Sequence, residues 1–159
     1  MTNDSFIYAV KRNNKRLYLI ALSFTKNHYD AEDIIQNAFL KLWNYKKEFN
    51  SEEHIDKWLT TVCVNESRNY IKHPFRKCAN LDDMVNLYNF DSIRDFDVFN
   101  AVMSLPKNER IVIHLFYYED MSVKEIAGML KIKESAVKTR LHRARKDLKE
   151  KLGDEWINE

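Results

Sequence analysis

Apolar residues in the first half of the chain recur at three- and four-residue steps, the spacing of helices with one buried face. The steps predict helices over 6–24, 30–43 and 55–71, the first of them with a polar gap over 11–16. Pro74 follows the third stretch and disfavours helical geometry in the residue before it, so we expect the third helix to end there. This part of the chain is therefore expected to form a small helical bundle.

The middle helix of this bundle has the clearest pattern. Asp30 is placed to cap it, and Glu32 and Asp33 fall in its first turn, where the helix dipole favours negative charge. We expect its apolar stripe to be buried, including the large ring of Trp43. The stripe comprises Ala31, Ile34, Ile35, Ala38, Phe39, Leu42 and Trp43.

A second series of helical periods occupies the end of the chain. It predicts helices on both sides of Pro106, a residue suited to the first turn of a helix. Ser122 and Glu125 then have the spacing of a capping box, which opens a short helix. A turn over 131–134 separates this helix from the last one. The side chains expected inside these last two helices are Ile126, Ala127, Leu130, Ala136 or Val137, Leu141, Ala144 and Leu148.

Residues 74–97, between the two series, lack a sustained period and hold three basic and five acidic side chains. We interpret them as an acidic, flexible linker with some short helical content, whose scattered Leu, Met, Tyr and Phe residues dock on a surface. The chain contains only two Gly and two Pro, which disfavours the tight turns of multi-stranded sheets. The predicted fold is therefore all-α, with one small helical domain over 1–73 and a second over 98–159.

The 159 residues carry a formal net charge of +2, but basic side chains are concentrated near the end. Residues 131–151 hold nine basic and three acidic side chains. Such a stripe is either a solvated helix face or a binding surface for a polyanion. Cys63 and Cys78 have no zinc or redox spacing and are typical of reduced thiols. No secretion signal and no run of about 20 apolar residues is present, so we expect a cytoplasmic protein without membrane insertion.

The two helices around the 131–134 turn have the features of a DNA-binding helix–turn–helix. Ala127 is small enough to let the helices approach closely, and Ile132 is placed to fill the turn. The last helix then turns its cations outward, where side chains reach phosphates and base edges. The agreement of these features favours DNA binding over an ordinary helical hairpin with a basic surface. The outward-facing and rim side chains are Lys138, Thr139, Arg140, His142, Arg143, Arg145 and Lys146.

These residues resemble region 4 of the extracytoplasmic-function sigma factors, the smallest class of bacterial RNA polymerase sigma subunits. The resemblance rests on residues 121–127 (MSVKEIA) and 137–148 (VKTRLHRARKDL). Residues 30–43 (DAEDIIQNAFLKLW), followed by Trp58 and Asn65, resemble region 2 of the same family. The two motifs occur in the family's order and span nearly the whole chain.

The resemblance implies that the chain binds core RNA polymerase, at its clamp coiled coil and its flap, and gives it a promoter address. The second helix would meet the clamp through Asp33, Gln36 and Asn37. The family traps the melted minus-ten element as single-stranded DNA, which calls for aromatic rings and cations along a groove. The positions that match the minus-ten contacts are Asn50, Ser51, His54, Trp58, Asn65, Arg68 and Lys72. The positions that match duplex contacts to the minus-thirty-five element are Lys138, Thr139, Arg140, His142, Arg143 and Arg145.

The chain departs from the family pattern at several positions. Asn37 replaces a glutamate, and Thr61 and Val64 replace cations near the minus-ten contacts. Lys131 replaces the usual glycine of the turn, where a positive φ carries a steric cost, and Lys133 replaces the usual capping serine. Neither lysine removes the outward face of the last helix.

Some of these residues have a structural alternative. Phe49 and Trp58 are more commonly core residues than platforms for unstacked bases, and the charge of Asp33 also suits the start of a helix. Both roles of Asp33 are compatible. The resemblance further implies an anti-sigma factor as a protein partner.

Two other classes of function are open to the sequence. An autonomous helix–turn–helix regulator, acting without core polymerase, would use the first domain for ligand binding or dimerisation. An enzyme would need a catalytic site, and the cluster of Asp30, Glu32 and Asp33 is the candidate. Asp30 and Glu32 point to different sides of a helix end, and no histidine joins them at ligand spacing. We therefore expect neither catalysis nor a metal or other cofactor.

Overall fold

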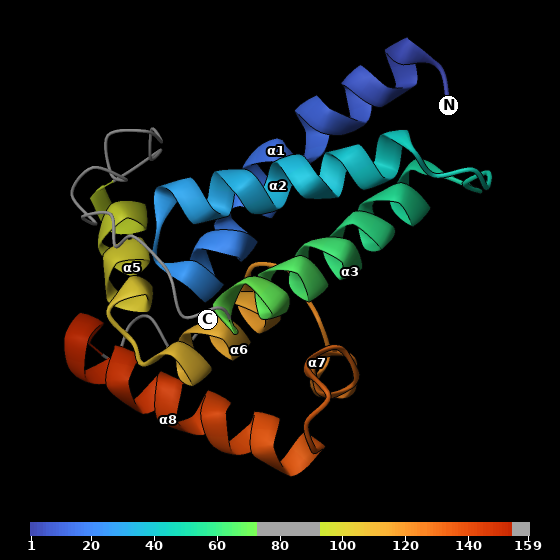
Figure 1. Cartoon of the computed structure of the whole chain (residues 1–159). Coiled ribbons are helices and arrows are strands. Elements are labelled where there is room, and N and C mark those ends of the chain that lie inside the picture. The colour runs from blue at the N-terminus through green and yellow to red at the C-terminus, as the bar shows by residue number, and fades with distance from the viewer. Residues whose placement is uncertain (73–92, 154–159) are drawn as a thin grey trace. The chain divides into compact units, whose positions relative to one another are not determined.

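The computed structural model describes residues 1–72 and 93–153, and within them every regular element is a helix (Figure 1). The chain divides into two compact units, Met1–Leu81 and Asp82–Glu159. Both findings confirm the predicted all-α fold with two small helical domains. The predicted docking of the linker, and the roles given to Pro74 and Cys78, lie outside the described residues.

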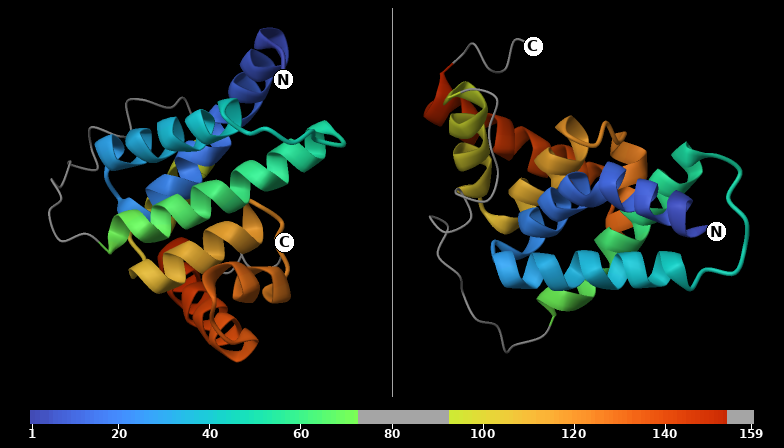
Figure 2. Two further views of the ribbon diagram at one scale, coloured as in Figure 1. Left: turned by 45° about the vertical axis from the view of Figure 1, so that its right-hand side comes forward. Right: turned by 90° about the horizontal axis from the view of Figure 1, so that it is seen from above.

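Helices α1 (Asn3–Thr25), α2 (His28–Trp43) and α3 (Glu52–Ile71) pack pairwise against one another in the first unit (Figure 2). Lys26 adopts a left-handed conformation, with φ 49°, at the connection between α1 and α2. Apolar side chains from all three helices fill the interior, as the periodicity predicted. The largest fully buried ones are Leu17, Tyr18, Ile20, Leu22, Ile34, Leu42 and Leu59.

Each helix of the first unit begins with a polar side chain that accepts a hydrogen bond from the backbone of its first turn. Ser51 Oγ accepts from the N–H of His54 at 3.1 Å at the start of α3. The predicted cap of α2, Asp30, is wrong. Asn27 has the extended backbone of a cap residue, and its side-chain oxygen accepts from the N–H of Asp30 at 3.0 Å. Asp30 itself lies within the first helical turn and is buried.

Trp43 is not the core residue that its place on the apolar stripe predicted. Its side chain is 49% exposed and contacts Phe6 edge-on, with ring centroids 5.0 Å apart. The reason is rotational: at about 100° per residue, Trp43 lies roughly 140° around α2 from the buried Ala38. Phe39, one turn before Trp43, already lies at the edge of the buried stripe.

The second unit contains α5 (Ile93–Met103), α6 (Lys107–Tyr117), α7 (Val123–Leu130) and α8 (Glu134–Leu152). Helix α8 packs against the other three. Helix α5 begins within the segment interpreted as a linker, and Pro106 is the N-cap of α6 rather than a residue of its first turn. The buried apolar side chains of α5, α6 and their connection include Val102, Met103, Leu105, Ile113 and Leu115.

Candidate nucleic-acid interfaces

The turn between α7 and α8 has the conformation that its sequence predicted. Helix α7 starts with the capping box: Ser122 Oγ accepts from the N–H of Glu125 at 3.1 Å, and the Glu125 carboxylate accepts from the N–H of Ser122. At the other end Lys131 has φ 57° and ψ 45°, the left-handed conformation that glycine adopts more readily. The N–H groups of Lys131 and Ile132 both donate to the carbonyl oxygen of Ala127. The turn therefore forms with lysine at the position of positive φ.

Helix α8 separates an apolar inner face from a polar outer face. Its N-cap, Lys133, makes no side-chain capping bond, as its replacement of serine predicted. The predicted inner residues Val137, Leu141, Ala144 and Leu148 are all buried. Their outward counterparts Lys138, Thr139, His142 and Arg143 are all exposed. The apolar period of the sequence therefore correctly predicted which face of α8 is buried and which is exposed.

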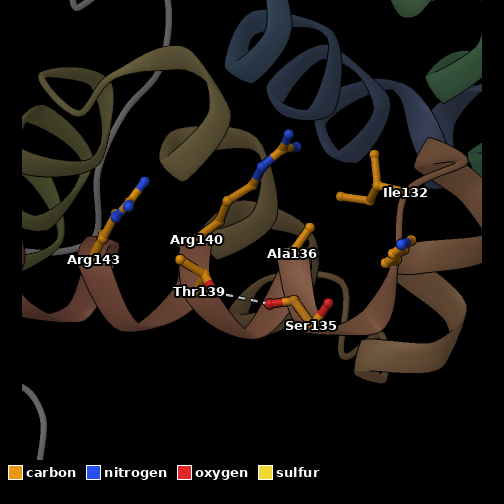
Figure 3. A pocket seen from close by; sticks show the side chains of 7 residues that line it. Ile132, Ser135, Ala136, Thr139, Arg140 and Arg143 are labelled. Carbon is orange, nitrogen blue, oxygen red and sulfur yellow. Dashed lines mark hydrogen bonds between the residues drawn. The ribbon is translucent and has the colours of Figure 1, made fainter.

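A shallow hollow runs along the first turns of α8 on its outer side (Figure 3). Thr139 Oγ1 donates to the backbone carbonyl of Ser135 at 2.9 Å inside this hollow. Arg140 and Arg143 place two guanidinium groups on the same lining, within one helical turn of each other. The lining side chains are Ile132, Lys133, Ser135, Ala136, Thr139, Arg140 and Arg143.

Arg145 differs from the other predicted minus-thirty-five residues because aromatic rings of the second unit hold it. Its Nε donates to the hydroxyl of Tyr117 at 2.9 Å. Its guanidinium lies 5.3 Å from the ring centroid of Phe116 and 5.6 Å from that of Tyr117. The side chain is half-buried, so Arg145 ties α8 to the end of α6.

In the first unit, the predicted minus-ten segment contains a cluster of aromatic rings. The ring centroids of Tyr45, Phe49 and Trp58 lie between 4.8 and 5.6 Å apart, and that of His54 lies 5.1 Å from Phe49. Phe49 and Trp58 are both half-buried, so each ring packs on its neighbours and also keeps a surface in solvent. Sequence analysis did not single out Tyr45, although it stands four residues before Phe49.

Backbone contacts fix the loop that precedes α3. The N–H of Asn50 donates to Nδ1 of His54 at 3.2 Å, and Ser51 caps the helix through the N–H of the same histidine. The loop and the first turn of α3 therefore share His54 as a common partner. Asn50, Ser51 and His54 are all exposed.

The remaining minus-ten candidates share one side of α3. At about 100° per residue, the predicted residues on this helix fall within an arc of roughly 80°. Asn65 and Lys72 are exposed and Arg68 is half-buried. Val64, one of the two positions where the family has a cation, is fully buried and lies outside this arc. The predicted residues on α3 are His54, Trp58, Asn65, Arg68 and Lys72.

The exposed face of α2 carries the predicted polymerase contacts. Asp33, Gln36 and Asn37 are all exposed. Tyr29 and Leu40 lie on the same face at helical spacing, with 69% and 59% of their surfaces exposed. Sequence analysis missed both, although Leu40 is an apolar residue outside the buried stripe. The face is therefore partly apolar, as surfaces that bind other proteins are.

Asp33 is also linked to the end of α3. The hydroxyl of Tyr70 donates to Asp33 Oδ2 at 3.0 Å. Partial burial, followed by this hydrogen bond and the nearby Asp30 carboxylate, raises the pKa of Tyr70 to about 12. The hydrogen bond from Tyr70 therefore orients the carboxylate of Asp33.

A groove lies between α2 and α3 in the first unit. It extends from the predicted polymerase face to the aromatic cluster, and Lys41 and Glu66 form an ion pair across it. The groove is lined by Asn37, Leu40, Lys41, Asn44, Tyr45, Lys46, Trp58 and Glu66. Within residues 1–72 and 93–153, no group of three His, Cys, Asp or Glu side chains is placed to hold a metal ion. In the same residues, no helix combines the length and apolar character needed to cross a bilayer.

These features define an all-helical protein with a helix–turn–helix and an exposed basic face in its second unit. Comparison with protein families specifies the class further. The family model "Sigma-70 region 2" matches residues 9–73, and the model "Sigma-70, region 4" matches residues 96–148. The chain belongs to the sigma-70 family, in the extracytoplasmic-function group.

Relatives of similar length support this assignment. The RNA polymerase sigma factor SigV of Bacillus subtilis (strain 168) is 27% identical, covering 99% of this chain and 96% of that protein. The ECF RNA polymerase sigma factor SigM of the same strain is also 27% identical, covering 94% of each chain. The sigma factor RpoE of Bartonella quintana, solved in complex with the anti-sigma factor NepR, has the same fold at 21% identity. The match to RpoE covers 93% of this chain and 96% of that one, with a TM-score of 0.64.

Proposed function

We propose that this chain binds core RNA polymerase and directs it to promoters by reading the minus-thirty-five element as duplex and the minus-ten element as melted single strand. The observation that carries the proposal is the pairing of both sigma regions on one chain, each matched by its own family model. An autonomous regulator that uses its first domain for ligand binding or dimerisation would not require that domain to match sigma region 2.

The second unit supplies duplex recognition. A helix that lies in the major groove reads base edges with the side chains of its outer face. Arginine contacts guanine through two hydrogen bonds, and threonine and histidine offer shorter polar contacts. Arg145, held by Tyr117, would contribute at the rim through phosphate or through the position of α8. The proposed contacts are Lys138, Thr139, Arg140, His142, Arg143 and Arg145.

The first unit supplies single-strand capture. Unstacked bases bind on aromatic rings, and cations along the same groove bind the phosphates between them. The half-exposed ring of Trp58 and the cations Arg68 and Lys72 lie within the same arc of α3. Asn65 adds an amide, which has both a donor and an acceptor for a base edge. The proposed contacts are Asn50, Ser51, His54, Trp58, Asn65, Arg68 and Lys72.

Polymerase binding is assigned to the exposed face of α2. Asp33, Gln36 and Asn37 would meet the basic clamp coiled coil, and Tyr29 and Leu40 would add apolar contact on either side. The second unit would meet the polymerase flap. The chain itself would carry out no bond-making chemistry, since catalysis belongs to the polymerase, and it would act in the cytoplasm with that enzyme. An anti-sigma protein is a further proposed partner, because the relative RpoE was solved with one.

Mapping transcript starts tests the proposed function. Cognate core polymerase would transcribe fragmented genomic DNA with and without the purified chain, and the 5′ ends of the transcripts would be sequenced. We expect the chain to create a set of starts that share two upstream elements. Starts that are unchanged by the chain, or that share no such elements, would contradict the proposal.

A further inference from the structure

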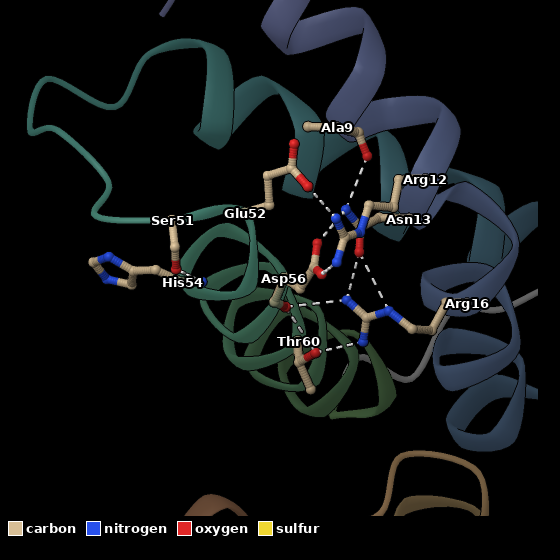
Figure 4. Close-up of polar contacts among 9 residues, drawn as sticks. All are labelled: Ala9, Arg12, Asn13, Arg16, Ser51, Glu52, His54, Asp56 and Thr60. Carbon is tan, nitrogen blue, oxygen red and sulfur yellow. Dashed lines mark hydrogen bonds and ion pairs between the residues drawn. The ribbon is translucent and has the colours of Figure 1, made fainter.

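A network of polar contacts joins the middle of α1 to the first turns of α3 (Figure 4). Its centre is Asn13, whose side chain is 1% exposed. The amide nitrogen of Asn13 donates to Asp56 Oδ1 and to the carbonyl oxygen of Ala9, both at 2.9 Å. An uncharged amide buried this deeply is stable only because each of its polar atoms has a partner.

Arg16 supplies the partner for the amide oxygen of Asn13. Its Nη2 and Nε donate to Asn13 Oδ1 at 2.7 and 3.3 Å. The same guanidinium donates to Thr60 Oγ1 at 2.6 Å and to the backbone carbonyl of Asp56 at 3.0 Å. The planar fork of arginine therefore connects one residue of α1 with two residues of α3.

Arg12, one turn before Arg16, completes the network. Its Nη2 lies 2.7 Å from Asp56 Oδ2, and its Nη1 lies 2.5 Å from Glu52 Oε2. Both carboxylate oxygens of Asp56 are therefore engaged by α1. Glu52, Asp56 and Thr60 follow one another at four-residue steps from the first residue of α3.

The network lies on the opposite side of α3 from the proposed minus-ten residues. At about 100° per residue, Glu52 and Thr60 lie roughly 40° to either side of Asp56. On the same scale, the arc that contains Trp58 and Asn65 is centred roughly 160° from Asp56. The network residues therefore lie behind the recognition face and do not reach a strand bound on it.

The first turns of α3 bury little apolar surface, so these polar contacts are a large share of what holds them against α1. Ile55 and Trp58 are half-buried, and the first fully buried apolar side chain of the helix is Leu59. Apolar contacts are non-directional, whereas hydrogen bonds have strict geometry. A set of directional contacts at four-residue steps fixes how far the helix is rotated about its axis.

We propose that Arg12, Asn13 and Arg16 are positioning residues for minus-ten recognition. They fix the rotation of the first turns of α3, and thereby the placement of His54 and the aromatic cluster that receive the melted strand. This inference rests on the proposed minus-ten function of α3. It adds that α1, which contacts no DNA in the proposal, determines the specificity of that site.

Asn13→Leu is the principal test, because it removes the central contacts while keeping the branched shape of the side chain and the surface charge. Asn13 is buried, so the substitution removes no phosphate contact. Holoenzyme would be assembled from cognate core polymerase and each variant. The dissociation constant would be measured for a fork-junction DNA with the mapped minus-ten sequence, and for the same DNA with that sequence scrambled. We expect the specificity ratio to fall about tenfold, the size of one lost base contact, while the affinity for core polymerase is unchanged.

Arg12→Gln provides a second variant that perturbs only the surface end of the network, in case Asn13→Leu folds poorly. Lys15→Gln is its matched control, since it removes the same charge from an exposed position on α1. We expect a reduced specificity ratio for Arg12→Gln and the wild-type ratio for Lys15→Gln. If the specificity ratio falls equally in both variants, the loss of any positive charge on α1 causes the effect, and the inference is overturned.

Thermal unfolding of each variant separates positioning from stability. A lowered Tm with a wild-type specificity ratio, measured well below that Tm, would show that the network only stabilises the bundle and would overturn the inference. A wild-type holoenzyme that does not discriminate between the two DNAs would instead refute the proposed function itself. The two failures are therefore distinct.

Discussion

Arg143 lies exposed on the outer face of α8 and lines the hollow that runs along its first turns. If this guanidinium pairs with a guanine, Arg143→Ala should weaken minus-thirty-five recognition by about 1–3 kcal/mol. The measurement is the affinity of holoenzyme for the mapped promoter and for one with a scrambled minus-thirty-five element. A loss of equal size on both DNAs would assign Arg143 to phosphate binding instead.

Lys131 holds a backbone conformation that disfavours a side chain. With φ 57° and ψ 45°, it pays a steric cost that glycine does not. Lys131→Gly should therefore raise the free energy of unfolding by up to about 1 kcal/mol, reduced by the greater freedom of glycine in the unfolded chain. Urea unfolding of the full chain measures this change. Lys131→Ala is the control, because alanine keeps the Cβ that is disfavoured at positive φ, and an equal gain there would refute the explanation.

Helix α6 contains a buried titratable group outside the proposed sites. His114 is 5% exposed, and its ring stacks on that of Tyr118 with centroids 4.9 Å apart. Burial lowers the pKa of His114 from 6.5 to about 4. The unfolded chain therefore binds a proton at a higher pH than the folded chain does, so stability is present above pH 6.5 and is lost as the pH falls towards 4.

The size of this effect can be measured by urea unfolding at a series of pH values across the window. A pKa shift of this size corresponds to a loss of unfolding free energy on the order of 3 kcal/mol. His114→Phe keeps an aromatic ring against Tyr118 and removes the titration, so its stability should depend less on pH in this range. An unchanged pH dependence in His114→Phe would mean that other groups cause the loss.

At the level of whole helices, the sequence pattern correctly predicted the features that depend only on how residues are spaced around a single helix. The capping box of Ser122 and the inward face of α8 were predicted correctly because both follow from spacing within one helix. Trp43 was predicted wrongly because a stripe of apolar residues does not show where its buried edge lies. The polar gap over 11–16 interrupts the apolar period of α1. The residues in this gap nevertheless form the hydrogen bonds from α1 to α3. Such hydrogen bonds depend on which side chains the partner helix offers, so the sequence pattern of one helix cannot predict them.

The whole molecule combines two helical units. The sequence indicated the helices of each unit, but not the contacts that tie each proposed site residue to its neighbours. The family resemblance assigned Asp33 to the proposed polymerase contact, but the hydrogen bond from Tyr70 joins residues 37 positions apart. Likewise, the cation count of the last helix predicted a basic surface but not that Phe116 and Tyr117 hold Arg145. Long-range side-chain pairs of this kind require the packed structure.

Asp33→Arg tests polymerase binding separately from DNA binding. A basic side chain facing the basic clamp coiled coil replaces attraction by repulsion, so we expect affinity for core polymerase to fall by at least about tenfold. Binding of duplex minus-thirty-five DNA by the free chain should be unchanged, because that surface lies in the second unit. The measurements are titration of labelled chain with core polymerase and with duplex DNA.

Tyr70→Phe is the control for this experiment, because it removes the hydrogen bond to Asp33 and leaves the charge of α2 intact. A small loss of core affinity in Tyr70→Phe beside a large one in Asp33→Arg assigns the effect to charge at the interface. Equal losses would assign it to the orientation of the carboxylate. If Asp33→Arg leaves core affinity unchanged while promoter selection persists, the exposed face of α2 is not the polymerase contact, and the partly apolar surface around Leu40 must serve a different partner.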